Sequence, residues 1–263
     1  MVIKLENIKE ILNQLLEKRC SIDEAEKLLK ANIIEEVGDL AKLDILRKMR
    51  TGIVEVIFAE NKTPKMIIEI IRTFLKTKKF TIVSRFTEEQ KSIIYNEFND
   101  NKDLSVEVNE LAKTIVVKFK NFEFEKTGGK IGVITAGSSD IPVAEEAKII
   151  AQSMGCEVIS SYDLGIAGIH RIFNPLSEMI KNGVQVIIVC AGMEGTLPGV
   201  VAALVDIPVI GVPVSSGYGL GEKGLGALTT MLQSCSPGLL VVNIDNGFGA
   251  GASAALIANQ SRK

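Results

Sequence analysis

Lys130-Ile-Gly-Val-Ile-Thr-Ala-Gly-Ser-Ser-Asp140 joins an apolar, β-branched run to a turn of glycine and serine. Four further short apolar runs follow it, at 157–160, 184–190, 208–212 and 239–244. These runs are nearly continuous in apolar residues, which is typical of parallel strands buried on both faces between helices. The sequence therefore predicts an α/β fold in which a three-layer α/β/α domain is built around a parallel sheet.

Glycine and charge are spread unevenly along the chain. Of the 23 glycines, 21 lie in residues 128–263, whereas 45 of the 62 charged residues lie in 1–127. We therefore expect two domains, an N-terminal helical plus small α/β domain over 1–127 and the parallel-sheet domain over 128–263. The formal net charge of −2 disfavours a dedicated nucleic-acid binder.

The cysteine and histidine content bears on compartment and metal binding. The N-terminus has no signal-peptide core, and the chain has no apolar run of roughly 18 residues, so we expect no membrane association and a cytoplasmic location. Cys20, Cys156, Cys190 and Cys235 form no CxxC pair, and His170 is the single histidine. A zinc site is therefore disfavoured.

The first domain shows helix and strand signals with capping residues. Ser21 followed by Glu24, and Thr87 followed by Gln90, are capping boxes, and Thr63-Pro64 is a helix start. The expected helices cover 6–18, 22–29, 39–50, 64–75 and a segment after Thr87, and the expected strands cover 53–59, 81–84, 104–108 and 113–119.

Charged residues near the strand ends of this domain have two interpretations. They form either a site for an anionic ligand or, as we favour, ordinary solvated surface charge. They are Arg50, Glu60, Lys62 and Arg85.

The second domain places glycine-rich segments after each strand. They cover 137–140, 165–171, 191–199, 215–224 and 245–251. Ligands of open parallel sheets bind outside the carboxyl ends of the strands, glycine allows close backbone approach, and helix N-termini favour phosphate. We therefore expect a nucleotide or phosphate ester at this edge, the alternative being purely structural turns. Because GxxxxGK[ST] and a well-placed GxGxxG are both absent, a P-loop or standard dinucleotide fold is disfavoured.

Several polar residues in these turns are candidates for chemistry. Glu194 is an isolated carboxylate in an apolar turn, and we favour burial with a raised pKa, as a general base, over exposure in a loop. Asp140 either caps a helix or contacts substrate. Asp245 is a candidate ligand for Mg²⁺. Without a family resemblance, Cys190 and Cys235 are interpreted as small apolar residues that fill space in the core. The alternation of strands and helices along the chain places Cys235 at the edge of the sheet opposite the glycine-rich turns.

Four motifs resemble the aminoimidazole ribonucleotide (AIR) carboxylase/mutase family, PurE, and thereby a PurE/flavodoxin-like fold. They are Gly137-Ser-Ser-Asp140, His170-Arg171, Ala191-Gly192…Leu197-Pro198-Gly199 and Pro208-Val-Ile-Gly-Val-Pro213. PurE-like enzymes carry a catalytic histidine two residues before the proline of their AGGAAHLPG motif. Thr196 occupies that position here, so purine carboxylation is disfavoured.

The full-length pattern is similar to the LarB family, which begins synthesis of the nickel-pincer nucleotide cofactor. The matching stretches are Glu55-Val-Ile-Phe-Ala-Glu-Asn-Lys-Thr-Pro64, Cys190-Ala-Gly-Met-Glu-Gly195, Gln233-Ser-Cys-Ser-Pro-Gly238 and Asn243-Ile-Asp-Asn-Gly-Phe-Gly-Ala-Gly251. The resemblance implies carboxylation of the pyridinium ring of nicotinate adenine dinucleotide and release of AMP, with carbon dioxide or bicarbonate as co-substrate and a divalent metal, expected to be Mg²⁺.

The resemblance also implies roles for individual residues. Cys235 corresponds to a nucleophile and Glu194 to a base, while Asp140 lies beside the carbon dioxide and ribose region. Substrate contacts are expected from Gly137, Ser138, Ser139, His170, Arg171, Ala191, Gly192 and Met193, although His170 has a structural alternative.

Assembly and alternative functions complete the expectations. PurE-like enzymes are homo-oligomers, so the resemblance implies an octamer. Either the helix before Cys235 bends back toward the glycine-rich turns or, as we favour, a neighbouring subunit supplies one part of the site. The alternatives are an AIR carboxylase/mutase of purine biosynthesis and a non-catalytic nucleotide-binding module, in which Cys235 would be dispensable.

Overall fold

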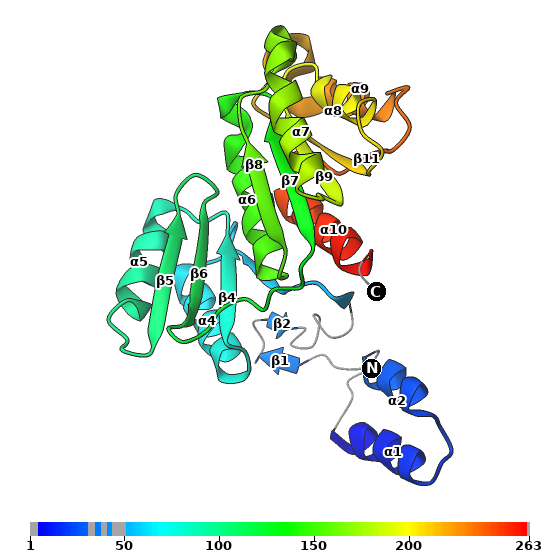
Figure 1. Cartoon of the computed structure of the whole chain (residues 1–263). Helices are drawn as coiled ribbons and strands as arrows, with labels where there is room; N and C mark the ends of the chain where they lie inside the picture. Colours follow the sequence, from blue (N-terminus) through cyan, green and yellow to red (C-terminus); the bar gives the residue numbers. More distant parts are fainter. Residues whose placement is uncertain (1–4, 31–34, 38–40, 44–50, 262–263) are drawn as a thin grey trace. The chain divides into compact units, whose positions relative to one another are not determined.

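The structure, a computed structural model, describes residues 5–30, 35–37, 41–43 and 51–261 (Figure 1). The chain divides into two compact units. The first comprises Met1–Val108 and Ile115–Phe122, and the second comprises Asn109–Thr114 and Glu123–Lys263. Residues 123–129 contain no helix or strand and lead into the first strand of the second unit.

Two short helices open the first unit, α1 (Leu5–Leu16) and α2 (Ile22–Lys30). The expected capping box is confirmed, because the backbone N–H of Ser21 donates to Glu24 Oε2 at 2.8 Å and the Glu24 N–H donates to Ser21 Oγ at 3.2 Å. Ala25 is buried, whereas Leu28 is 40% exposed.

The helix expected over 39–50 is wrong where the structure describes it. Residues Ala41–Leu43 form strand β2, which pairs antiparallel with β1 (Glu35–Val37). Hydrogen bonding across this pair satisfies backbone groups and overrides a weak helical pattern. The remainder of the expected helix lies outside the described residues.

The first unit contains a four-stranded sheet in the order β3-β4-β6-β5. Its strands are β3 (Val56–Phe58), β4 (Phe80–Ser84), β5 (Leu104–Asn109) and β6 (Thr114–Phe119), and its helices are α4 (Pro64–Thr77) and α5 (Glu88–Phe98). Buried residues of the strands and of both helices form one core between the sheet and the helices. The Thr63 cap and the Thr87–Gln90 capping box are both confirmed.

Charged residues at the strand ends of this unit contact one another or nearby backbone. Glu60 and Arg85 approach to 3.9 Å, and Lys62 Nζ donates to the Phe58 carbonyl at 2.8 Å. These contacts favour the surface-charge interpretation. Arg50 lies outside the described residues.

The second unit is the expected parallel sheet. Its strands are β7 (Lys130–Thr135), β8 (Glu157–Ser161), β9 (Val186–Ala191), β10 (Val209–Pro213) and β11 (Leu239–Val241). The spatial order is β11-β10-β9-β7-β8, and every neighbouring pair is parallel. All residues of β9 and β10 are buried, as their continuous apolar sequences predicted. This is the strand order of the flavodoxin-like fold.

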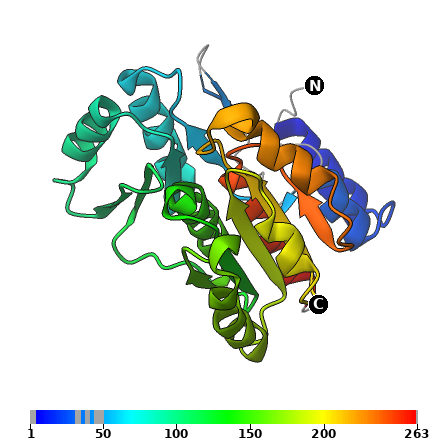
Figure 2. The ribbon, with the colours of Figure 1, turned by 90° about the horizontal axis from the view of Figure 1, so that it is seen from above.

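Helices cover both faces of this sheet (Figures 1 and 2). One face is covered by α6 (Ile141–Ser153) and α10 (Gly247–Gln260), and the other by α7 (Phe173–Lys181), α8 (Leu197–Ala202) and α9 (Leu225–Leu232). The two helices of the first face pack closely at Gly251, where a Cβ would lie 2.3 Å from the Ala147 carbonyl oxygen. Within the described segments, no helix combines the length and apolar character needed to cross a membrane.

The order of the strands fixes where a ligand site can form. The chain runs from β7 outward to β8, then returns to place β9 on the other side of β7. The connections after β7 and β9 therefore leave the sheet in opposite directions and open a crevice between them. Residues 136–140 and 192–197 follow these two strands.

Candidate active site

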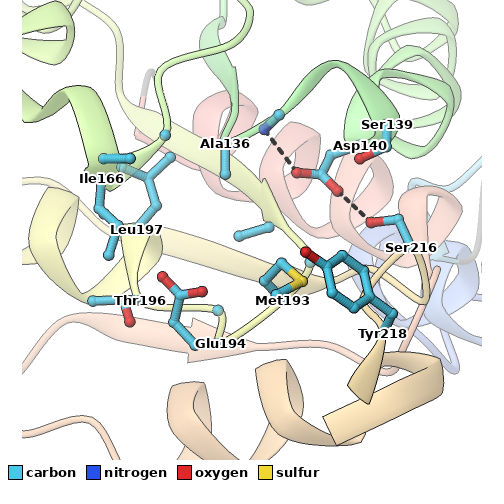
Figure 3. Close-up of a pocket in the computed structure, with 16 residues that line it drawn as sticks. Ala136, Ser139, Asp140, Ile166, Met193, Glu194, Thr196, Leu197, Ser216 and Tyr218 are labelled. Atoms are coloured by element: carbon cyan, nitrogen blue, oxygen red, sulfur yellow. Dashed lines mark hydrogen bonds between the residues drawn. The ribbon is translucent and has the colours of Figure 1, made fainter.

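A pocket of about 280 Å³ lies at this crevice (Figure 3). Four glycine-rich turns of the second unit contribute to it, those after β7, β8, β9 and β10. The polar side chains in its lining belong to Ser139, Asp140, Glu194, Thr196, Ser216 and Tyr218. The pocket thus occupies the edge at which the sequence predicted a ligand.

Asp140 is the buried carboxylate of this pocket, with a side chain only 2% exposed. Its Oδ2 accepts the Gly137 N–H at 2.9 Å, and its Oδ1 accepts the Ser216 hydroxyl at 2.8 Å. Burial raises the pKa of Asp140, while these two hydrogen bonds and one from the Gly192 N–H oppose the rise. Although Asp140 is the N-terminal cap residue of α6, its side chain makes no capping bond to that helix.

The backbone of the turn after β9 approaches Asp140 closely at Gly192. A Cβ at Gly192 would lie 2.3 Å from Ser216 Oγ and 3.2 Å from Asp140 Oδ1, so only glycine fits there without movement. The next residue, Met193, has a positive φ of 45° and is 45% exposed. The turn therefore presents backbone next to the carboxylate and directs the Met193 side chain outward.

Glu194 lines the pocket but is exposed, so the expectation of burial is wrong. The backbone explains this outcome, because Met193 and Gly195 on either side both have positive φ and form a tight turn. Of the apolar residues in this segment, Leu197 is buried in the core, whereas the Glu194 carboxylate lies at the mouth of the pocket. Figure 3 shows Asp140, Glu194 and Thr196 around one hollow.

Cys235 lies in a second hollow, of about 450 Å³, between α8 and α9. It follows α9, as alternation predicted, and does not line the pocket that contains Asp140. Gly195 and Thr196 line both hollows, so the two adjoin. Cys235 is exposed, which argues against the filler interpretation.

Two other cysteines are core residues, as expected for Cys190. Cys190 is fully buried at the end of β9, and burial raises the pKa of its thiol strongly. Cys156 is also buried, and its thiol donates to Asn259 Oδ1 at 3.4 Å. Cys20 is partly exposed between α1 and α2.

Some expected contact residues lie outside the pocket lining. His170, Arg171 and Ser138 are exposed and do not line it. Arg171 instead pairs with Asp163, at 2.9 Å between Nη1 and Oδ2. Of the remaining expected substrate contacts, Gly137, Ser139, Ala191, Gly192 and Met193 all line the pocket.

Among the residues that the structure describes, side chains alone do not form a metal site. Asp245 Oδ1 accepts the Ser215 N–H at 2.9 Å and thereby fixes the turn after β10. Across the described ranges, no group of three histidine, cysteine, aspartate or glutamate residues could hold a metal ion. The donor set does not fit a metal held by protein side chains alone.

The ionisable side chains that line the pocket are all acidic. Its lining includes the carboxylates of Asp140 and Glu194 and, among the described residues, no lysine, arginine or histidine. A phosphorylated or carboxylated ligand would lack a cationic partner in this lining.

Sequence reasoning missed Ser216 and Tyr218. Both follow β10 in the segment 215–224, whose glycine content had marked it as a ligand turn. Ser216 bonds Asp140 across 76 positions of sequence, and Tyr218 is 78% exposed. Their place in that turn was the available signal, but their proximity to Asp140 depends on the strand order.

Comparison with known proteins matches both halves of the chain. The sequence model described as AIR carboxylase matches residues 130–263, and that described as LarB/PurE-like N-terminal domain matches residues 34–120. An uncharacterized protein of Methanocaldococcus jannaschii is 46% identical over 257 residues, covering 98% of this chain and 99% of the relative.

Two mutases each match about half of the chain. The N5-carboxyaminoimidazole ribonucleotide mutase of Thermotoga maritima is 36% identical over 135 residues, covering 49% of this chain and 74% of the relative. That of M. jannaschii is 36% identical over 129 residues, covering 49% and 75%.

The fold and the pocket define a PurE-like domain of the carboxylase and mutase type. Because a LarB-type N-terminal domain accompanies it, the chain belongs to the LarB family.

Proposed function

We propose that this protein carboxylates C5 of the pyridinium ring of nicotinate adenine dinucleotide and then cleaves the phosphoanhydride. The products are pyridinium-3,5-biscarboxylate mononucleotide and AMP, and the reaction is the first step of nickel-pincer nucleotide synthesis. The observation that carries the proposal is the pocket at the strand-order switch, in which Thr196 replaces the PurE histidine and Glu194 stands two residues before it.

The ring chemistry requires a nucleophile because an electron-poor pyridinium does not attack carbon dioxide. The Cys235 thiolate adds to ring C4, and the displaced electron pair moves to the ring nitrogen. The resulting dihydropyridine attacks carbon dioxide from C5, forming the new carbon–carbon bond. Glu194 then removes the C5 proton, the C4–S bond breaks, and the aromatic ring and the thiolate are restored. Water subsequently cleaves the phosphoanhydride.

The pocket supports this sequence with a buried carboxylate and backbone donors. Asp140 is held by neutral donors and has a raised pKa, which suits a group beside carbon dioxide and the ribose. Glycines in the surrounding turns let substrate approach the backbone. No step of this reaction is assigned to a divalent metal, because the side chains of the described segments supply no cluster of three ligands.

Assembly is part of the proposal. Cys235 lies in the adjoining hollow, and the pocket lining lacks a cation to face phosphate. Both features are explained if a second copy of the chain brings its Cys235 and basic groups to the pocket of the first. We therefore propose a homo-oligomer, an octamer in the manner of PurE-like enzymes, as the active form. Full activity of a monomer would contradict this arrangement.

The experiment incubates the full chain with nicotinate adenine dinucleotide, ¹³C-bicarbonate and Mg²⁺. The expected result is AMP together with a mononucleotide that carries one ¹³C carboxylate, detected by mass spectrometry. A parallel incubation with N5-carboxyaminoimidazole ribonucleotide tests the mutase, which the 36% identity to such mutases makes the second candidate. Turnover in the second incubation alone overturns the proposal, and turnover in neither favours a non-catalytic nucleotide-binding module.

Replacement of the nucleophile tests the covalent step. Cys235→Ala should lower turnover by at least about 1,000-fold, because no other group supplies the ring addition. Cys20→Ala is the matched control and should retain full turnover. Intact mass and peptide mapping should detect a substrate adduct on Cys235 of the wild type. Retained turnover in Cys235→Ala would refute the covalent step while leaving the overall reaction in place.

A further inference from the structure

The first unit contains a separate cavity of about 260 Å³ that the proposed reaction does not use. It lies where the C-terminal end of α4 meets the start of β4 and the segments next to β3 and β6. Its lining consists of three phenylalanines, one valine, two lysines and one glutamate, namely Phe74, Phe80, Phe122, Val54, Lys78, Lys79 and Glu55. All of these residues belong to the first unit.

The walls of the cavity are aromatic and largely fixed. Phe80 and Phe122 stack with ring centroids 5.2 Å apart and an interplanar angle of 17°. Phe74 is only 1% exposed and Val54 only 3%, so both belong to the packed core. A planar ring that enters the cavity would meet aromatic and aliphatic surface and gain stacking contacts. The volume suits a molecule of roughly one or two rings, since it is just below the usual range for ligand pockets.

The polar part of the lining is net positive. Lys78 Nζ lies 4.7 Å from the centroid of the Phe74 ring, which places its charge against an aromatic wall. Lys79 also lines the cavity, with its Nζ 5.3 Å from the centroid of the neighbouring Phe119 ring, and Glu55 is the one carboxylate in the lining. This balance is opposite to that of the pocket around Asp140, whose lining has two carboxylates and, in the described part of the chain, no cation.

We propose that this cavity is a binding site for a planar aromatic anion, with the ring against Phe74, Phe80 and Phe122 and the anionic group facing Lys78 and Lys79. An aromatic carboxylate and a nucleoside monophosphate share this chemistry. The inference is independent of the proposed reaction because it uses no residue of the pocket around Asp140.

Binding to the full-length protein, measured by calorimetry and saturation-transfer NMR, tests the proposal with matched ligand pairs. Benzoate is compared with the neutral benzamide, and AMP with the neutral adenosine. At least one anion should bind about tenfold more tightly than its neutral partner, and inorganic phosphate should not compete. Binding of benzoate identifies the ligand as an aromatic carboxylate, and binding of AMP identifies it as a nucleoside monophosphate. Absence of binding by both anions overturns the proposal.

Substitutions that remove the charge of a lining side chain while changing its shape little can locate the bound anion. Lys78→Gln and Lys79→Gln should each weaken the anion about fivefold and leave the neutral ligands unchanged, whereas Glu55→Gln should tighten the anion. Lys120→Gln is the control, because Lys120 is exposed and does not line the cavity. Anion affinity that is unchanged in both lining variants overturns the assignment and places the anion elsewhere. Binding that persists in Asp140→Asn separates this site from the other pocket.

Discussion

Asp140 and Glu145 are two buried carboxylates at the start of α6, and they have opposite electrostatic environments. Asp140 is bonded by the neutral Gly137 N–H and Ser216 hydroxyl. Burial raises the pKa of Asp140, and these donors only partly oppose it. Burial acts on Glu145 in the same direction, but hydrogen bonds from Tyr162 and Lys148 outweigh it, and the pKa is lowered.

The difference shows what each carboxylate contributes. Glu145 is compensated by an ammonium group, with Lys148 Nζ at 2.9 Å from its Oε1, so its ionised form stabilises the fold. Asp140 has no such compensation and faces the pocket, so its ionised form is costly to the fold and accessible to a substrate. A buried carboxylate with neutral partners at an opening is therefore a candidate for chemistry, and one with a cationic partner is a candidate for structure.

The largest expected effect separates the two carboxylates by activity. Asp140→Asn should lower kcat/KM for AMP release by at least about 100-fold, because the variant keeps the shape of the side chain but loses its charge and proton exchange. Glu145→Gln should stay within about threefold of the wild type. Both proteins must first give wild-type circular dichroism. Equal losses in the two variants would remove the distinction between functional and structural carboxylates.

An intermediate effect separates them by stability and pH. Glu145→Gln should lower the free energy of unfolding by about 1–3 kcal/mol at neutral pH. Because the pKa of Glu145 is lowered in the folded protein, this stabilisation is present above the pKa of the unfolded chain and is lost as pH falls through the folded pKa. The pKa of Asp140 is raised, so the cost of its ionised form grows as pH rises through the folded pKa. Asp140→Asn should therefore gain stability relative to the wild type with rising pH.

Denaturant unfolding at fixed protein concentration, at pH 4 and pH 7.5, measures both trends. Glu157→Gln serves as the control, since Glu157 is exposed and its Lys130 partner is 4.0 Å away. Its change should stay within about 0.5 kcal/mol. The assigned environments would be contradicted if the change in the free energy of unfolding varied with pH in the same direction in the Asp140 and Glu145 variants.

The smallest expected effect concerns the Ser216 hydroxyl, a neutral donor to Asp140. Ser216→Ala removes a hydrogen bond that lowers the pKa of Asp140, so that pKa should rise further. We expect turnover to fall about three- to tenfold, with the acidic limb of the kcat/KM profile displaced to higher pH. Ser215→Ala is the control, because Ser215 contributes its backbone N–H to Asp245. An unchanged pH profile in Ser216→Ala would remove Ser216 from the site.

Much of the fold could be predicted from local sequence. The apolar runs located all five strands of the second unit, and capping pairs such as Thr87 and Gln90 located helix starts. The failure at 41–43 has a physical cause, since pairing between short strands depends on a partner segment more than on intrinsic preference. Burial of Glu194 was favoured over exposure because composition records that a turn is apolar but not the positive φ values that direct a side chain outward.

The sequence by itself determined the parallel sheet and the edge at which its ligand turns gather, because apolar runs and glycines act over a few neighbouring residues. Only the tertiary structure decided which of those turns meet. Asp140 contacts Ser216 because β9 lies between β7 and β10 in the sheet, so the turns after β7 and β10 reach the same crevice. Cys235 occupies an adjoining hollow because it follows the C-terminal end of α9. Strand order is set by packing of the whole domain, and that information is absent from any short stretch of the chain.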